Sequence, residues 1–183
     1  MKKFTVPTRE EVSENNQAIF DNLQNMLGFV PSLYAYYAKS ETALADYLAL
    51  QNRKSSIQAK EREIINLVVS QVNNCEYCLA AHTTIGKMQG FTSEQIIEVR
   101  RAEISFNTKF DALAKFVQET AINRGKTSAE TTEKLFAAGY TDANLVDIVI
   151  VIGDKIVSNY LHSITQLPID WEAAPKLEVS ANA

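Results

Sequence analysis

The chain has 183 residues, of which 46% are hydrophobic and 22% are charged, and its net charge at pH 7 is −4. This composition excludes a disordered chain, and the length is sufficient for one compact domain with a substantial core. The longest apolar stretch, around residues 146–152, is too short for a membrane span, which needs about 18 or more apolar residues. We expect no membrane association, no nucleic-acid partner (no basic block is present), no secretory signal, and a cytoplasmic location.

Helical periodicity runs through the sequence and predicts an all-α fold in a single domain over residues 1–183. A capping box at Thr8 and Glu11 predicts the first helix start, and Ser40 is the expected cap of the second helix. The segment from about residue 166 has no helical period, and we expect this irregular tail to lie on another surface or on a partner subunit. The predicted helices cover about residues 8–27, 40–53, 58–72, 75–89, 92–101, 108–123, 129–138 and 142–165.

The two cysteines of the chain, Cys75 and Cys78, lie three residues apart, and His82 follows them. A spacing of i, i+3, i+7 places the three side chains on one face of a helix. Asn73 with Glu76 resembles a capping box, so we expect Cys75 in the first turn, where the positive helix end favours loss of the thiol proton. His82 is close enough to Cys78 to exchange a proton with a thiol or to stabilise a thiolate. In a cytosolic chain this pattern indicates redox chemistry or metal binding.

A carboxylate joins this cluster if the chain reverses at Asn73 and the adjacent Asn74. Glu63 precedes the turn and His82 follows it at nearly equal separations, so both lie roughly 14–15 Å from the turn at 1.5 Å of rise per residue. Glu63 is therefore expected to face His82 across an antiparallel hairpin. A carboxylate beside an imidazole orients the ring and favours its charged form.

Plainer interpretations remain open for these residues. The cysteines could be small buried residues, and two thiols with His82 and Glu63 could hold zinc, although structural zinc sites use more cysteine or histidine. Covalent haem attachment needs a histidine directly after the second cysteine, where Leu79 stands, and a thioredoxin-type site expects a strand before the motif. His162, the other histidine of the chain, is expected to be a packing residue within its helix.

The residues Glu63, Cys75-Glu-Tyr-Cys78 and His82 resemble the motif of the alkylhydroperoxidase D-like (AhpD-like) family, within the carboxymuconolactone decarboxylase superfamily. The early Val30-Pro31 and the closing Leu167-Pro-Ile-Asp-Trp171 resemble its peroxidase-related branch, so the likeness covers nearly the whole chain. The resemblance implies an AhpD-like multi-helix fold with the Cys-x-x-Cys pair at the start of a helix in an antiparallel hairpin. It also implies homo-oligomers (trimers or hexamers) and thiol-dependent peroxidase or disulfide reductase activity without haem, flavin, metal or another cofactor.

By this resemblance, Cys78 corresponds to the cysteine that attacks peroxide and Cys75 to the resolving cysteine that faces the reductant. Glu63 and His82 correspond to the proton relay. The helix-start argument, taken alone, favours Cys75 as the more acidic thiol. The best-studied members carry a histidine immediately before the second cysteine, where this chain has Tyr77, which does not carry protons near neutrality. This departure bears on peroxidase strength and on use of the family's usual peroxiredoxin partner.

The main hypothesis is therefore an antioxidant enzyme that reduces a peroxide substrate. Cys78 becomes a sulfenic acid, Cys75 condenses with it to a disulfide, and an external dithiol or thiol protein reduces the pair. One alternative is a decarboxylase- or lactone-type enzyme, as the superfamily name suggests. The other is a non-enzymatic redox-sensing or metal-binding module whose thiols regulate assembly.

Overall fold

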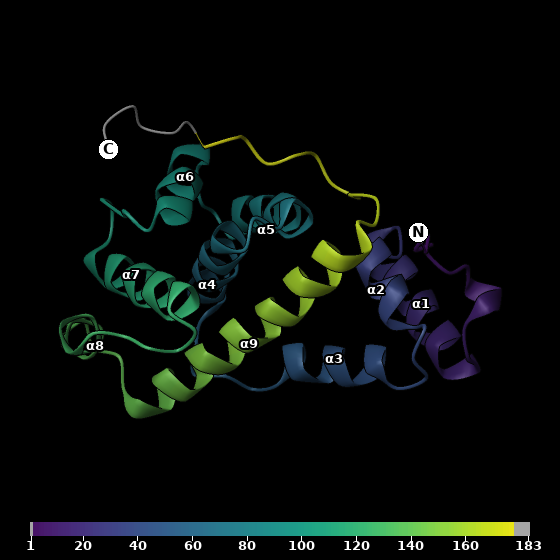
Figure 1. The fold of residues 1–183 in the computed structure, drawn as a ribbon, viewed down its shortest axis with the longest axis horizontal. Helices are drawn as coiled ribbons and strands as arrows, with labels where there is room; N and C mark the ends of the chain where they lie inside the picture. The colour runs from purple at the N-terminus through teal and green to yellow at the C-terminus, as the bar shows by residue number, and fades with distance from the viewer. Residues whose placement is uncertain (1, 178–183) are drawn as a thin grey trace.

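The structure is a computed structural model that describes residues 2–177. Over this range it has nine α-helices, a short 3-10 helix at Arg9–Glu11 and no strand, which confirms the predicted all-α fold (Figure 1). The α-helices are α1 (Glu14–Leu27), α2 (Ser32–Tyr37), α3 (Ala43–Asn52), α4 (Ala59–Val72), α5 (Glu76–Met88), α6 (Ser93–Arg101), α7 (Thr108–Ile122), α8 (Ala129–Ala137) and α9 (Asp142–Thr165).

Helix α4 is the centre of the fold and packs against α5, α6, α7 and α9. A capping box between Gln58 and Glu61 begins it, at the predicted position. The apolar residues in its middle, among them Ile64, Leu67 and Val68, are fully buried, because neighbouring helices cover this part of α4 on almost every side. In Figure 1, α9 crosses the molecule diagonally, with α6, α7 and α8 to one side and α1, α2 and α3 to the other.

The buried side chains form two hydrophobic clusters. The larger joins α4, α6, α7, α8 and α9, and the smaller joins α1, α2, α3, the start of α5 and Leu167 of the tail. The consecutive residues Cys78 and Leu79 belong to different clusters. The first turn of α5, which carries the cysteines, therefore lies at the boundary between the two clusters.

Two predicted helix starts are wrong. The capping box of Thr8 and Glu11 is present, but it closes only the 3-10 turn, and α1 begins after Ser13, whose side chain caps it. The N–H of Ser40 bonds back into the last turn of α2, so this residue completes one helix instead of starting the next. Helix α3 begins three residues later, at Ala43.

Helix α9 ends where Gln166 takes the left-handed conformation, and residues 166–177 follow it without helical structure. The tail runs from the end of α9 back to α6 (Figure 1), where Arg100 donates a hydrogen bond of 2.6 Å to the carbonyl of Pro175.

Helix α9 is the longest helix, with 24 residues. Neither α9 nor any other single helix of residues 2–177 has the length and apolar character of a membrane span, and only the bent pair α8–α9, at 117°, meets that test. The buried face of α9 carries the charged Asp154 and Lys155 and the polar Asn159. Buried polar and charged groups need partners. Asp154 finds its partner in Gln51 of α3, whereas Lys155 and Asn159 contact the α4–α5 hairpin that carries the predicted site.

Candidate functional site

Cys75 and Cys78 are buried free thiols at the start of α5, in the second helix of the α4–α5 hairpin. Cys75 is the N-cap itself, and its sulfur accepts the backbone N–H of Cys78 at 3.4 Å. The predicted capping box of Asn73 and Glu76 is wrong, because Asn73 ends α4 and its amide donates to Asn159 Oδ1 at 3.0 Å. The side chain of Asn73 is therefore bound to α9, and Cys75 caps α5 in its place.

Glu63 and His82 meet across the hairpin, as their positions relative to the turn predict. His82 Nδ1 lies 2.8 Å from Glu63 Oε2, and the other carboxylate oxygen accepts a hydrogen bond of 3.0 Å from Asn66. A carboxylate can only accept, so the hydrogen-bond network assigns the ring proton to Nδ1. Burial raises the pKa of Glu63, but its interactions with His82, with the charge of Lys155 and with the Asn66 amide outweigh burial and hold that pKa below its usual range.

Lys155 is a further residue of the site and lies outside the motif that the sequence predicts. It comes from α9, its exposed fraction is 3%, and its Nζ lies 2.7 Å from His82 Nε2. An ammonium group can only donate, so Nε2 accepts this bond, and the three residues form a continuous chain from Glu63 through His82 to Lys155. The signal that could have revealed it is a charged residue in the middle of the apolar α9 sequence.

The surroundings of the two thiols shift their pKa values in opposite directions. The hydrogen bond from Cys75, together with the charge of Lys155, the neighbouring His82 and the Asn159 amide, lowers the pKa of Cys78 against the effect of burial. The hydrogen bond to Cys78 and burial raise the pKa of Cys75. The structure therefore favours Cys78 as the thiolate, which reverses the expectation from the helix-start argument.

A cavity of about 490 Å³ opens onto Cys78, and His82 and Lys155 line it as well. Cys75 is not among its lining residues, so only one thiol of the pair faces the cavity. Most of the wall is apolar or aromatic, as is common for sites that bind small organic molecules. The aromatic lining residues are Phe29, Tyr34, Tyr47, Tyr77 and Trp171.

Tyr77, the residue directly before Cys78, holds the C-terminal tail against the site through its contacts with Asp170 and Trp171. Its hydroxyl donates to Asp170 Oδ2 at 2.7 Å and accepts the N–H of Leu33 at 3.2 Å. Asp170 also accepts two hydrogen bonds from Ser32, and Trp171 packs edge-on against the Tyr77 ring at 5.1 Å. Burial raises the pKa of Tyr77, so this hydroxyl stays protonated and its role is structural.

We expect Tyr77→Phe to lower the free energy of unfolding by about 1–3 kcal/mol, because it leaves the buried N–H of Leu33 with one partner fewer and removes a hydrogen bond to the Asp170 carboxylate. Urea unfolding followed by circular dichroism measures this change. The control is Tyr36→Phe on α2, since the Tyr36 hydroxyl makes no hydrogen bond within the described residues. Equal losses in the two variants would contradict the fastening role of Tyr77.

The structure also bears on the packing role of His162 and on the possible metal site. His162 is buried, contacts the Tyr77 ring at 5.0 Å and has Nε2 at 3.0 Å from the Leu167 carbonyl, which confirms it as a packing residue. Within residues 2–177, no group of three or more His, Cys, Asp or Glu side chains is arranged to hold a metal ion.

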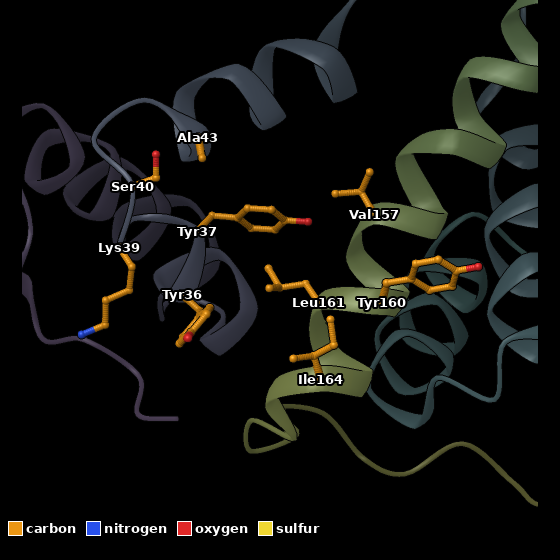
Figure 2. A pocket seen from close by; sticks show the side chains of 9 residues that line it. All are labelled: Tyr36, Tyr37, Lys39, Ser40, Ala43, Val157, Tyr160, Leu161 and Ile164. Atoms are coloured by element: carbon orange, nitrogen blue, oxygen red, sulfur yellow. The ribbon is translucent and has the colours of Figure 1, made fainter. Parts of the chain in front are cut away.

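A second cavity, of about 620 Å³, lies between α2, the start of α3 and the C-terminal half of α9 (Figure 2). Tyr37 points into it, and Val157, Leu161 and Ile164 form its α9 wall. Its charged lining residue, Lys39, extends away from the centre in Figure 2. This cavity has no thiol, imidazole or carboxylate among its lining residues, so the reactive groups gather at the smaller cavity.

The match to a known protein family falls on the segment that carries the cysteines and the Glu63–His82 pair. Residues 38–119 match the sequence profile of the Carboxymuconolactone decarboxylase family. This segment contains Glu63, Cys75, Cys78 and His82 but ends before Lys155. No curated protein matches the chain.

Solved structures share the fold along nearly the whole chain. An uncharacterized peroxidase-related protein from Silicibacter sp. TM1040 has a TM-score of 0.79 and 23% identity, over 92% of this chain and 89% of that protein. An uncharacterized peroxidase-related protein from Ralstonia eutropha JMP134, described as an alkylhydroperoxidase AhpD core, has a TM-score of 0.82 and 19% identity, over 92% of each chain. The debrominase Bmp8, in complex with 2,3,4-tribromopyrrole, has a TM-score of 0.77 and 15% identity, over 93% of this chain and 92% of that one.

Proposed function

We propose that this chain, whose residues 38–119 match the Carboxymuconolactone decarboxylase family and whose helical fold is shared with AhpD-like structures, has a thiol-dependent hydroperoxidase activity. The observation that carries the proposal is the environment of Cys78. Its thiol has a lowered pKa, faces a cavity, and stands beside the Glu63–His82 pair and a second thiol that can resolve an oxidised product. Cysteines that react with peroxides have a lowered pKa, are accessible to the oxidant and often lie next to a resolving cysteine.

The proposed cycle has three steps. The Cys78 thiolate attacks the outer oxygen of an organic hydroperoxide, an S–O bond forms as the O–O bond breaks, and the released alkoxide takes a proton and leaves as an alcohol. The Cys75 thiol then attacks the sulfenic sulfur, which forms a disulfide and releases water. An external dithiol reduces this disulfide, is itself oxidised, and restores the Cys75 thiol, the Cys78 thiolate and one proton. Glu63 fixes the orientation of the His82 ring, and the pair keeps the groups that transfer protons in place.

The test is steady-state consumption of cumene hydroperoxide by the purified protein with a panel of dithiols, including dithiothreitol, dihydrolipoamide and a reduced thioredoxin. We expect turnover that saturates with hydroperoxide and requires a dithiol. Protein alkylated with iodoacetamide is the control, and its turnover should fall to the background rate. Absence of turnover with every dithiol would overturn the proposal, and one zinc ion per chain in the purified protein would favour the metal-binding alternative.

The aromatic wall of the cavity favours one second candidate, reductive dehalogenation of an electron-rich aromatic ring. In this reaction the Cys78 thiolate takes the halogen as the ring carbon takes a proton, and Cys75 then displaces halide to form the disulfide. The fold is shared with a debrominase that binds 2,3,4-tribromopyrrole. Dithiol-dependent bromide release from a polybrominated pyrrole, without hydroperoxide turnover, would decide for this candidate.

A further inference from the structure

The hydrogen bonds of His82 prevent it from protonating a group in the cavity directly. Its Nδ1–H donates to Glu63 and its Nε2 accepts from Lys155. Both ring nitrogens are therefore occupied, and no N–H of this ring is left to point at Cys78. The proposed reaction nevertheless releases an alkoxide beside Cys78, and that alkoxide needs a proton.

Lys155 is the next group along the same chain of hydrogen bonds. Its ammonium carries three N–H donors, and the bond to His82 Nε2 uses one of them. Lys155 lines the cavity together with Cys78, and its charge acts on that thiol. Burying an ammonium costs free energy, which makes a buried lysine in a cavity with a reactive thiol a candidate functional residue.

We propose that Lys155 is the general acid of this site and hands a proton to the oxygen that leaves when the Cys78 thiolate attacks a hydroperoxide. The inference rests on the hydroperoxidase function proposed above. It assigns to His82 and Glu63 the task of holding the Lys155 ammonium in place.

Protons balance over the cycle with this assignment. In the first step the Lys155 ammonium gives one proton to the alkoxide and becomes a neutral amine, while Cys78 becomes a sulfenic acid. Disulfide formation consumes the Cys75 thiol proton and releases water. Reduction of the disulfide by a dithiol returns one proton to Cys75 and one to Lys155, which restores the starting state.

Several titratable groups surround Lys155, so a pH profile alone would not isolate its role. The elements packed around it contribute Glu63 from α4, Cys75, Cys78 and His82 from α5, Tyr34 from α2, Tyr47 from α3, and Asp154 from α9 itself. A comparison of leaving groups avoids this difficulty. tert-Butyl hydroperoxide releases an alkoxide that needs a proton, whereas peracetic acid releases acetate, which needs none.

The experiment measures single-turnover oxidation of reduced protein by these two oxidants at pH 7. We expect Lys155→Met to slow the reaction with tert-butyl hydroperoxide by about 100-fold more than the reaction with peracetic acid. The ratio of the two rate constants cancels any change in the thiolate fraction of Cys78. The matched control is Lys87→Met, an exposed lysine on α5 outside the cavity lining, which should leave the ratio unchanged.

Equal slowing of the two oxidants in Lys155→Met, or no slowing, would overturn the role of Lys155 while leaving the hydroperoxidase function intact. Wild-type protein that reacts with neither oxidant would overturn the function and the inference together. Circular dichroism checks the fold of the variant. If Lys155→Met does not fold, wild-type rates across hydroperoxides with leaving groups of different pKa decide the point: a shallow dependence supports an internal acid and a steep dependence contradicts it.

Discussion

We expect Cys78→Ser to abolish hydroperoxide turnover, with a loss on the order of 10³-fold or more, because it removes the nucleophile. The thiol of Cys78 faces the cavity and has a lowered pKa, whereas Cys75 lies outside the cavity lining and has a raised pKa. Cys75→Ser should instead permit a single oxidation and then stop, since no second thiol remains to resolve the sulfenic acid.

Trapping with dimedone and mass spectrometry distinguishes these outcomes. Cys75→Ser should carry one dimedone adduct per chain at Cys78 after one equivalent of hydroperoxide, and Cys78→Ser should carry none. A Cys78→Ser protein that forms sulfenic acid at the parent rate would show that the two cysteines have the opposite roles.

We expect Glu63→Gln to lower kcat/KM by about 100-fold, because the glutamine amide keeps the shape of the carboxylate but removes the charge that fixes the His82 ring. The effect on stability depends on pH. The pKa of Glu63 is depressed in the folded state, so its contribution to stability is complete above its ordinary pKa of 4.5 and is lost as the pH falls through the folded value. The stability difference between wild type and Glu63→Gln should therefore shrink below about pH 4.5.

Glu61→Gln is the matched control for this prediction. Glu61 is a buried carboxylate on the same helix, but its partners are Tyr140, the N–H of Gln58 and Lys109, away from the cavity. Urea unfolding should show some loss of stability in this variant, and its kcat/KM should stay near the parent value. A parallel fall of activity in both variants would mean that Glu63 acts only through the packing of α4.

The helices and the Glu63–His82 pair could be predicted because they depend on local sequence. Helix α6 begins after Thr92, as its predicted range requires, with a capping box between Thr92 and Gln95. The positions of Glu63 and His82 follow from one tight turn between two packed helices. At that turn Asn74 takes a positive φ of 51°, which a short polar residue tolerates. Once the turn is fixed, helical rise alone brings the two side chains to the same level.

The contribution of α9 could not be predicted, because it depends on how helices far apart in sequence pack against each other. Lys155 bonds to His82 across 73 positions, and Tyr77 bonds to Asp170 across 93. Periodicity shows which face of α9 is buried but not which helix covers it. The same packing explains the wrong cap of α5, since Asn159 of α9 binds the Asn73 amide.

The sulfur of Cys75 is the cap of α5 in the reduced protein, and in the proposed cycle the same atom becomes half of a disulfide. Oxidation therefore exchanges a helix cap for a covalent cross-link, and the free energy of capping becomes part of the reduction potential. A weak cap contributes about 0.5 kcal/mol. For a two-electron couple this corresponds to roughly 10 mV towards a more easily reduced disulfide. A substitution that alters how α5 begins would thus shift the equilibrium between the proposed disulfide and its dithiol reductant by about twofold, even if it leaves both cysteines untouched.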